Sequence, residues 1–478
     1  MRTSNLSGNR KNNKALARGL DGTGNTNVLN SIPDKLQKNL ADFKQEHLLT
    51  FWDELSDTEQ HELDAQLESI NFEYIDSLQN QSSEEIEKTI EPCATVLLDD
   101  SRNQQGIDSI RRGEIGVLTV AGGQGTRLGW SGPKGTYPAT PISGKSLFQV
   151  IAEQIVFASK KYNTSIPWYI MTSVENDDVT RSFLLDNNCF GLERTDIFLF
   201  TQGEVPVVDK DGKMLLSSKS KIAMNPDGHG GVISALQRSG GLDEMVTRGV
   251  KYLSYVQIDN PLVNVVDPWF LGLHIGDLSS AEASSKCVKK MDPDERVGVF
   301  CSVNGNVEIV EYSDLPSEKA SERDKDGQLS YGSGSIALHL FSIEFLQRIA
   351  EDLPWHKANK KVPFVDLHTG EIINPDTPNA YKFEKFVFDV LRFAKKPLVV
   401  ETKREEEFAP IKNASGQDSP KTSHALQLER ANRWLSLRGV QVSEEARVEI
   451  SALTAVRAGD LVPSTLPSSI GANQKVIL

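Results

Sequence analysis

A short apolar run that opens directly into a glycine-rich loop constrains this chain more than any other feature of its sequence. Residues 116–120 read Gly-Val-Leu-Thr-Val, typical of a buried strand, and three glycines fall within the next five positions. Glycine lets the backbone approach a ligand closely and turn its N–H groups toward phosphate oxygens. Arg127 and Lys134 add fixed positive charge beside this loop. Since open α/β sheets bind ligands at the carboxyl ends of their strands, the pattern predicts a phosphate-binding loop.

Other phosphate loops, and a purely structural turn, explain this segment less well. A dinucleotide-binding fingerprint that starts at Gly123 requires glycine at the position of Leu128. A Walker A loop that ends at residues 144–146 requires glycine at the position of Ala139. A glycine turn that serves only to reverse the chain leaves the adjacent arginine and lysine unexplained. An NAD(P)-dependent oxidoreductase is therefore disfavoured.

The residues that follow the loop alternate between short apolar runs and stretches with helical spacing. Further apolar runs occupy residues 167–171, 197–200 and 252–258. The helical stretches that separate them include residues 147–158, 178–186 and 233–245. Such alternation predicts an α/β fold with a largely parallel sheet and helices on both faces.

Changes in composition divide the chain into four segments. Residues 1–30 are rich in Asn, Gly, Ser and Lys, which predicts a disordered basic tail. Apolar residues then recur at helical spacing up to Pro92, and Asp57 with Gln60 resembles a capping box. Near the other end, a polar linker precedes a predicted helix and strands; these elements span residues 413–423, 425–437 and 446–453. We therefore predict a tail (1–30), an N-terminal helical accessory region (31–105), a catalytic domain (106–403) and a small C-terminal domain (404–478).

Charge and apolar patterning exclude several classes of protein. With 52 Lys and Arg against 66 Asp and Glu, the net charge is −14, which argues against a nucleic acid or an anionic membrane as partner. No apolar run reaches the length of about 18 residues that predicts a membrane-spanning helix, and the N-terminus lacks the apolar segment of a secretory signal. The four cysteines lie far apart without a CxxC pair, so we expect neither a disulfide framework nor structural zinc. These features predict a cytoplasmic protein.

The glycine-rich loop closely resembles the signature of the sugar nucleotidyltransferases of the UDP-N-acetylglucosamine pyrophosphorylase and UDP-glucose pyrophosphorylase group. The resemblance extends from about residue 40 to about residue 460, because further blocks follow in the order of that family. These blocks lie at residues 45–52, 202–203, 226–231, 259–260, 310–313, 384–389, 410–412 and 450–453. Their pattern is nearest to the eukaryotic-type N-acetylglucosamine branch.

The resemblance implies a fold, a reaction and a cofactor. The fold would be Rossmann-like, of the nucleotide-diphospho-sugar transferase (GT-A-like) type, with a mostly parallel sheet, an N-terminal helical region and a small C-terminal α+β domain. The reaction would convert UTP and a sugar 1-phosphate, above all N-acetylglucosamine 1-phosphate, into a UDP-sugar and pyrophosphate. Such a uridylyltransferase must position two anions and stabilise the charge that develops between them. Mg²⁺ is the expected cofactor, with Mn²⁺ as an alternative, and the oligomeric state is open.

The resemblance also assigns roles to residues within the blocks. Residues expected to bind UTP are Gly122, Gly123, Gln124, Gly125, Gln202 and Gly228. Residues expected to act in catalysis are Arg127, Lys134 and Lys385. Residues expected to bind the sugar are His229, Glu311, Tyr312 and Lys412. Asp259 ends an apolar run, where a carboxylate suits a Mg²⁺ ion that keeps waters and binds substrate phosphates, and Asp389 is a candidate second ligand.

Two segments depart from the N-acetylglucosamine branch and leave the preferred sugar open. The eukaryotic N-acetylglucosamine enzymes typically carry Asn where this chain has His229, and Asn-Ala-Gly-Asn where it has Gly332-Ser-Gly-Ser335. Losing amide side chains removes donors that could hold the sugar or its acetamido group. Alternatively, His229 could hydrogen-bond only the backbone of a glycine turn. The other interpretations are a UDP-glucose or broad-specificity UDP-sugar pyrophosphorylase, and a catalytically silent protein that binds uridine nucleotides.

Overall fold

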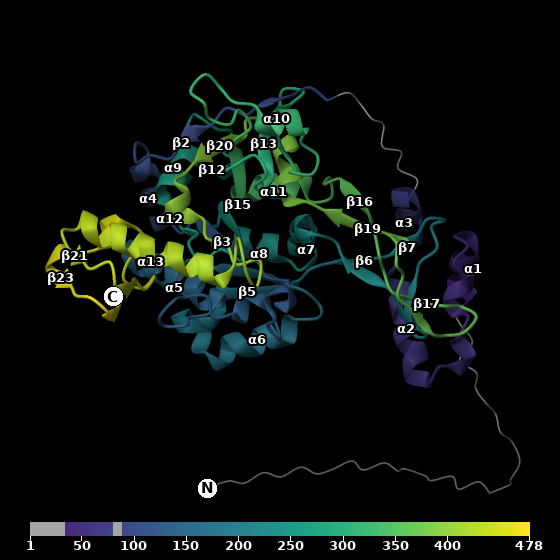
Figure 1. Ribbon diagram of the computed structural model, residues 1–478. Coiled ribbons are helices and arrows are strands. Elements are labelled where there is room, and N and C mark those ends of the chain that lie inside the picture. The colour runs from purple at the N-terminus through teal and green to yellow at the C-terminus, as the bar shows by residue number, and fades with distance from the viewer. Residues whose placement is uncertain (1–33, 80–87) are drawn as a thin grey trace, which may run out of the picture.

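The computed structural model describes residues 34–79 and 88–478 and is built around one large mixed sheet (Figure 1). Within these residues the sheet has eleven strands, and its main path follows the order β2-β20-β12-β15-β11-β3-β4-β5. The strands of this path are β2 Val96–Leu97, β20 Leu398–Glu401, β12 Ala283–Lys289, β15 Ser333–Ser342, β11 Tyr252–Gln257, β3 Ile115–Val120, β4 Trp168–Thr172 and β5 Ile197–Thr201. The strands off this path are β1 Ile90–Pro92, β13 Val299–Val303 and β14 Asn306–Val310. On the main path, β15 is antiparallel to both its neighbours and all other pairs are parallel, so the predicted α/β class is confirmed.

The parallel strands β11, β3, β4 and β5 form the half of the sheet that carries the glycine-rich loop. From β3 the chain adds β4 and then β5 on one side. It then returns to place β11 on the opposite side of β3, where Tyr252 pairs with Ile115. The sheet therefore has a topological switch point between β3 and β11, the position at which open α/β sheets form their ligand crevice.

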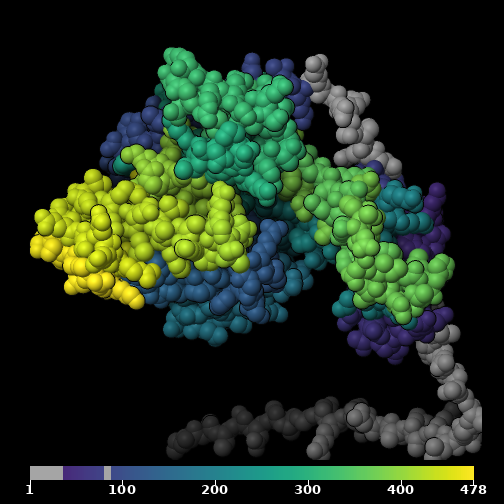
Figure 2. Space-filling model, in the orientation of Figure 1, coloured from purple at the N-terminus to yellow at the C-terminus, as the bar shows by residue number. Residues whose placement is uncertain are grey.

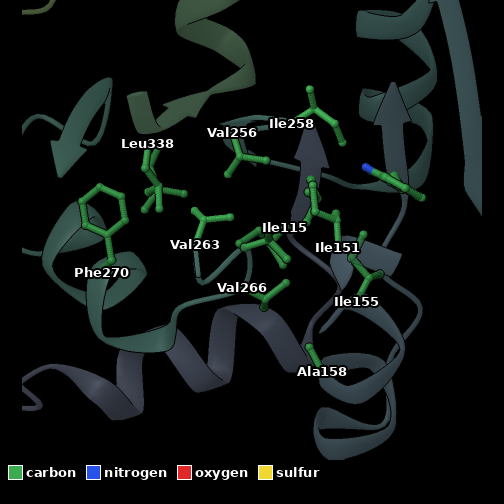
Figure 3. Packing of buried hydrophobic residues seen from close by; sticks show 14 of the residues in the cluster. Ile115, Ile151, Ile155, Ala158, Val256, Ile258, Val263, Val266, Phe270 and Leu338 are labelled. Carbon is green, nitrogen blue, oxygen red and sulfur yellow. The ribbon is translucent and has the colours of Figure 1, made fainter. Parts of the chain in front are cut away.

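Helices cover both faces of this sheet. On one face, α4, α5 and α9 enclose a core in which the side chains of Ile115, Ile151, Val256 and Phe270 converge (Figure 3). On the other face, a second buried cluster includes residues of α7, α8 and α11. The helices of the main body are α4 Asn103–Arg111, α5 Leu147–Tyr162, α6 Asp177–Asp186, α7 Val232–Arg238, α8 Gly241–Arg248, α9 Pro268–Ile275, α10 Ser317–Ser321, α11 Ile343–Ile349 and α12 Arg404–Glu407.

Two helix boundaries differ from the sequence prediction. Residues 233–245, predicted as one helix, are divided between α7 and α8 because Gly240 adopts a φ of 75°, the left-handed conformation that ends helices. The predicted capping box lies one residue earlier in the chain. Ser56 Oγ accepts from the backbone N–H of Glu59, whose carboxylate accepts from the backbone N–H of Ser56.

A separate lobe combines the N-terminal helices with strands from much later in the chain. Its helices, α1 (Asp34–Asp42), α2 (Asp57–Ser69) and α3 (Phe72–Gln79), bury apolar side chains against these strands. The strands of the lobe and its neck are β6 Glu204–Pro206, β7 Val208–Asp209, β8 Leu216–Ser218, β9 Lys221–Ile222, β10 Met224–Pro226, β16 Trp355–Lys360, β17 Phe364–Val365, β18 Ile372–Ile373 and β19 Ala380–Lys385. Figure 1 shows the lobe set to one side of the main body. Residues 90–105 of the predicted helical region instead contribute β1, β2 and the start of α4 to the main body.

The C-terminal residues form a small body that packs on the main sheet domain. Its buried cluster joins the long helix α13 to two pairs of short parallel strands, and Glu449 accepts hydrogen bonds from the backbone N–H groups of Ile142 and Ser143 at 2.8 and 3.0 Å. The elements are α13 Pro420–Leu437, β21 Gln441–Val442, β22 Arg447–Glu449, β23 Ser469–Ile470 and β24 Lys475–Ile477. α13 begins inside the predicted linker because Ser419 caps it, and the strand predicted over 446–453 is limited to β22.

Three further predictions concern the chain as a whole. All four cysteines are free thiols in this structure. Among the helices of the described residues, none is long and apolar enough to cross a membrane. The predicted tail, residues 1–30, lies outside the residues that the structure describes.

Candidate active site

The glycine-rich loop after β3 is held in shape by the residues that follow it. The N–H of Gly125 donates to the carbonyl of Gly132 at 2.9 Å, and the N–H of Lys134 donates to the carbonyl of Gly123 at 3.0 Å. A side chain at position 125 would collide with Trp130, because its Cβ would lie 2.7 Å from the Trp130 Cβ. Gly123 is exposed, with open space where a side chain would be. The loop therefore presents its backbone at Gly123 to the solvent side of the crevice.

Lys134 and Asp259 meet at the switch point between β3 and β11. Lys134 Nζ lies 3.5 Å from Asp259 Oδ2, and the two side chains are only 16% and 15% exposed. Glycine is required at position 135, since a Cβ there would lie 2.2 Å from the ring of Phe148 in α5. The main core thus fixes the backbone that carries this lysine. An ammonium and a carboxylate held at the sheet edge can bind phosphate oxygens and a hard cation, respectively.

The segment 407–412 is tied to the loop that carries Asp259, and it brings Lys412 to the same edge. The carbonyl of Asp259 accepts from the N–H of Ile411 at 2.8 Å. The side chain of Asn260 accepts from the N–H of Ala409 at 3.0 Å and donates to the carbonyl of Glu407 at 2.7 Å. The sequence did not predict these hydrogen bonds of the Asn260 side chain, because Glu407 and Ala409 are almost 150 residues away in the chain.

Gln202 and Gly228 face each other at the carboxyl end of β5. Gln202 Nε2 donates to the carbonyl of Gly228 at 2.8 Å, which fixes the orientation of the amide because a carbonyl can only accept. Its oxygen then points toward the glycine-rich loop, 3.0 Å from the place where Gly122 would carry a Cβ. Glycine is required at 228, where φ is 81° and a Cβ would lie 2.4 Å from the carbonyl of Lys385. The structure thus brings Gln202, Gly228 and the glycine-rich loop together.

Lys385 lies at the end of β19, beside Gly228 rather than beside the glycine-rich loop. Its N–H donates to the carbonyl of Asp227 at 2.7 Å, and its ammonium lies 4.9 Å from the centre of the Trp355 ring. Burial lowers the pKa of Lys385, against the opposing charges of acidic neighbours. Within the described residues, no hydrogen bond or ion pair joins Lys385 to Lys134 or Asp259.

His229 is held as a neutral ring with one free nitrogen. Its Nδ1 accepts a hydrogen bond from the N–H of Val387 at 3.1 Å, and its ring stacks on Phe386. Burial lowers the pKa of His229 to about 4, so the ring is neutral near pH 7 and its proton must lie on Nε2. A neutral histidine in this state presents a single N–H donor, as an asparagine amide also can.

The predicted second metal ligand is wrong, because Asp389 is already engaged. Its side chain is 2% exposed, with Oδ2 at 2.7 Å from His356 Nε2 and Oδ1 at 3.4 Å from the guanidinium of Arg392. Among the described residues there is no group of three or more His, Cys, Asp and Glu side chains that could hold a metal ion. Asp259 is therefore not part of a preformed cluster of three or more metal-ligating side chains within residues 34–79 and 88–478.

Among the described residues, no ion pair joins the remaining predicted residues to Lys134 or Asp259. Glu311 follows β14, and burial together with the charge of Asp314 raises its pKa, while the charge of Lys412 opposes this rise. Tyr312 is 48% exposed, and Arg127 is exposed with no ion pair among the described residues. Gln124 forms a β-bridge with Pro133 and so helps to close the glycine-rich loop.

The segment Gly332–Ser335, which departs from the family pattern, makes contacts within its own sheet. The carbonyl of Gly332 accepts from the N–H of Lys290 at 2.8 Å, and the N–H of Ser335 donates to the carbonyl of Gly298 at 2.8 Å. Ser335 Oγ accepts from the N–H of Ala337, a non-glycine residue with a φ of 54°. In this structure Ser335 therefore stabilises a strained stretch of β15.

Comparisons with known proteins identify similar chains over most of this sequence. The model of the family described as UTP--glucose-1-phosphate uridylyltransferase matches residues 59–454. The chain is 37% identical over 433 residues to "UDP-N-acetylhexosamine pyrophosphorylase-like protein 1" of Xenopus tropicalis, covering 84% of each chain. It is 36% identical over 437 residues to "UDP-N-acetylglucosamine diphosphorylase 2" of Arabidopsis thaliana, covering 84% of this chain and 85% of that one. Among solved structures, a putative UDP-N-acetylglucosamine pyrophosphorylase from Entamoeba histolytica matches with a TM-score of 0.72 and 32% identity, over 82% of this chain and 99% of that chain.

Proposed function

The chain belongs to the UTP--glucose-1-phosphate uridylyltransferase family, and we propose that it makes UDP-N-acetylglucosamine from UTP and N-acetylglucosamine 1-phosphate. It is a uridylyltransferase that forms a UDP-sugar and pyrophosphate from UTP and a sugar 1-phosphate. The choice of the N-acetylated sugar is supported by the names of its relatives from Xenopus and Arabidopsis.

The observation that carries the proposed site is the meeting of Lys134 and Asp259 at the switch point of the sheet. Four adjacent parallel strands, β11, β3, β4 and β5, end here. They are followed in that order by Asp259, the glycine-rich loop, Ser173 and Gln202. Figure 2 shows that the surface is hollowed between the C-terminal residues, drawn in yellow-green, and the blue and green parts of the main body. A phosphate-rich nucleotide fits such a crevice, although the protein as a whole is acidic, because the positive groups are local.

The reaction needs no covalent intermediate on the protein. An oxygen of the sugar phosphate would attack the α-phosphorus of UTP, forming one P–O bond, while the bond to the β-phosphate oxygen breaks and pyrophosphate leaves. Three phosphate groups of one substrate must then be held against the phosphate of the other. Lys134 would stabilise the charge that develops at the α-phosphate, with Arg127 and the glycine-loop N–H groups around the triphosphate.

Recognition of the base would fall to Gln202 and Gly228. Because the amide nitrogen of Gln202 is bonded to the carbonyl of Gly228, its oxygen is free to accept the N3–H of uracil. The backbone N–H of Gly228 would donate to a uracil oxygen. This pair of contacts matches the acceptor and donor groups along one edge of the base.

The side chain of Asp259 suits Mg²⁺, with Mn²⁺ as the alternative. Mg²⁺ commonly binds one or two carboxylates and completes its octahedron with waters and substrate phosphates, so Asp259 is an adequate protein donor at the crevice. The ion would supply charge neutralisation to the phosphates. Lys134 Nζ lies 3.5 Å from the same carboxylate, so the lysine and the carboxylate share one electrostatic environment.

The sugar phosphate would bind beside the nucleotide. Lys385 and Lys412 would hold the phosphate of the sugar and the pyrophosphate released from UTP. Glu311, Tyr312 and the Nε2–H of His229 would contact the hydroxyl groups of the sugar. The neutral state of His229 favours broad sugar tolerance as the second candidate function. A single N–H donor satisfies a hydroxyl of glucose as well as a group of the acetamido sugar.

We propose the cytoplasm as its compartment, because all four thiols are free and widely separated in sequence. UTP and the sugar 1-phosphate are the only partners that we propose, with neither nucleic acid nor membrane among them.

Release of pyrophosphate from UTP by the purified protein tests this proposal. The protein would be incubated with Mg²⁺, UTP and, separately, the 1-phosphates of N-acetylglucosamine, N-acetylgalactosamine, glucose and galactose. We expect the highest kcat/KM for N-acetylglucosamine 1-phosphate. Equal or higher kcat/KM for glucose 1-phosphate would favour the broad-specificity alternative, and UTP binding without pyrophosphate from any sugar would favour the silent binding protein.

A further inference from the structure

Asp227 is a buried carboxylate directly behind the proposed base-binding pair. It is 5% exposed and lies between two glycines whose missing side chains make room for it. A Cβ at Gly203 would lie 2.5 Å from its Oδ2, and a Cβ at Gly231 would lie 1.9 Å from its Oδ1. Its Oδ1 has no hydrogen-bond partner. A carboxylate buried in this manner requires an explanation, because burying a charge without full compensation is unfavourable.

A helix-capping role does not explain this carboxylate. The turn His229–Gly231 and helix α7 begin just after it, but neither start receives a side-chain hydrogen bond. Its charged neighbours are Arg238 of α7 and Lys385 of β19, and among the described residues it forms a salt bridge with neither. Lys385 is bonded to the carbonyl of Asp227, not to its side chain.

The carboxylate faces the segment that carries Gln202, because a Cβ at the next residue, Gly203, would lie 2.5 Å from Asp227 Oδ2. Burial raises the pKa of Asp227 to about 6, against the charge of Arg238, a hydrogen bond from the Gln202 side chain and the charge of Lys385, which favour the ionised form. An ionised carboxylate can accept hydrogen bonds but cannot donate them. The same holds for the carbonyl of Gly228, which accepts from Gln202 Nε2 at 2.8 Å. Both groups therefore demand the NH₂ side of the Gln202 amide and leave its oxygen turned toward the glycine-rich loop.

We propose that Asp227 is a positioning residue for nucleotide specificity, which locks the amide of Gln202 so that only a base with an N3–H is accepted. This inference rests on the proposed function, in which Gln202 reads the base. Uracil presents an N3–H to the amide oxygen. Cytosine presents a lone pair at N3, which would face that oxygen without a hydrogen bond.

Reversal of the amide would allow cytosine to bind, and Asp227 opposes that reversal. A reversed Gln202 would place its oxygen against the carbonyl of Gly228 and the carboxylate together, an arrangement of three acceptors without a donor. Replacing the carboxylate by a carboxamide of the same shape supplies a donor for the reversed orientation. Protonation of Asp227 would supply an O–H donor in the same place.

Competition between UTP and CTP tests the proposal. Initial rates of pyrophosphate release with a saturating sugar 1-phosphate would give kcat/KM for both nucleotides, in the wild type and in Asp227→Asn. We expect the ratio of kcat/KM for UTP over CTP to fall by about tenfold or more, equivalent to about 1.4 kcal/mol, mainly through a gain with CTP, because the carboxamide supplies the donor that a reversed Gln202 amide lacks. Glu204→Gln, which makes the same chemical change two residues from Gln202 on an exposed side chain, should leave the ratio unchanged.

The wild-type protein provides a measurement that does not depend on the folding of a variant. As the pH falls from about 8 to about 5.5, Asp227 takes up a proton, and the UTP to CTP ratio should decline through a midpoint near pH 6. In Asp227→Asn this dependence should disappear.

The outcomes separate failure of this inference from failure of the proposed function. If Gln202→Ala loses its preference for UTP while Asp227→Asn retains the full wild-type ratio at every pH, Asp227 has no such role. If Gln202→Ala keeps the preference, the proposed base-reading site itself is wrong, and the inference is overturned with it. If no nucleotide yields pyrophosphate, uridylyl transfer fails before either question arises, and that result overturns both.

Discussion

A buried ion-pair cluster behind the proposed metal-binding loop makes the stability of the main sheet sensitive to one lysine. Lys286 in β12 is 0% exposed, and its ammonium lies 2.6 Å from Asp267 Oδ2 and 2.6 Å from Glu407 Oε2. Both carboxylates are almost fully buried, at 2% and 7% side-chain exposure. Lys286→Met keeps the length and apolar stem of the side chain but removes the charge between the two carboxylates.

The expected loss follows from what remains after the substitution. Asp267 retains its ion pair with Arg457, whereas among the described residues the Glu407 side chain loses its direct ion pair and keeps the hydrogen bond from the hydroxyl of Thr402 at 2.9 Å, with Arg457 and Arg430 as more distant charges. Breaking a buried pair by removing one partner costs about 3–5 kcal/mol. Lys289→Met is the matched control on the same strand: that lysine is 64% exposed and lies 3.7 Å from Glu401, a pair of the kind that contributes about 0–1 kcal/mol.

Native-state hydrogen exchange followed by mass spectrometry measures this difference where it arises. For peptides that cover β12, we expect the free energy of opening to fall by about 3–5 kcal/mol in Lys286→Met and by less than about 1 kcal/mol in Lys289→Met. Equal, small losses in the two variants would refute the reasoning, because the cluster would then contribute no more than a surface pair.

Four further predictions concern the proposed site and the core. Lys134→Ala should lower kcat by about 100-fold or more while changing the Kd for UTP far less, and parallel losses in calorimetry and kinetics would mean that the lysine only anchors nucleotide. Gly135→Ala should also lower kcat, because its Cβ would lie 2.2 Å from the ring of Phe148 and displace the backbone of Lys134. An unchanged kcat would contradict the close packing of Gly135 against Phe148. Burial lowers the pKa of His274 and His339 to about 3, below the unfolded value of 6.5, so the unfolded chain binds protons that the folded chain excludes. Each histidine should therefore lower the free energy of unfolding by about 1.4 kcal/mol per pH unit as the pH falls below 6.5. Urea denaturation between about pH 5 and pH 6.5 measures this pH dependence, and His274→Gln should remove about half of the part that the two histidines contribute. His229→Asn should raise the ratio of kcat/KM for N-acetylglucosamine 1-phosphate over glucose 1-phosphate, and no change in that ratio would remove His229 from the sugar pocket.

The elements around the glycine-rich loop could be predicted from the sequence because local signals determine them. Apolar runs followed by glycine or polar residues marked β3, β4, β5 and β11 within a few residues of their observed ends. Helix α5 likewise follows from its apolar spacing and from Ser146, whose side chain accepts from the N–H of Gln149. Since parallel strands end at a common edge, the sequence could indicate that the glycine-rich loop and Asp259 each lie at a ligand-binding edge, whereas their meeting depends on the pairing of β11 with β3.

Features that depend on long-range contacts could not be predicted in this way. The lobe draws on residues 34–79, 204–226 and 355–385, and no local pattern indicates that these segments share one core. Asp389 occupies a position that the sequence alone made a plausible metal ligand, yet His356 and Arg392 hold it. The burial of Asp227 depends in the same way on glycines on either side of it in space.

The central claim is that this crevice transfers a uridylyl group, and one measurement tests it most directly. The purified protein would be mixed with UTP, N-acetylglucosamine 1-phosphate and Mg²⁺, and both products would be quantified over time by phosphorus NMR. We predict that UDP-N-acetylglucosamine and pyrophosphate appear in equal amounts with the wild type and are abolished in Asp259→Ala, which still binds UTP. Pyrophosphate without the UDP-sugar, or undiminished synthesis by Asp259→Ala, would contradict the account.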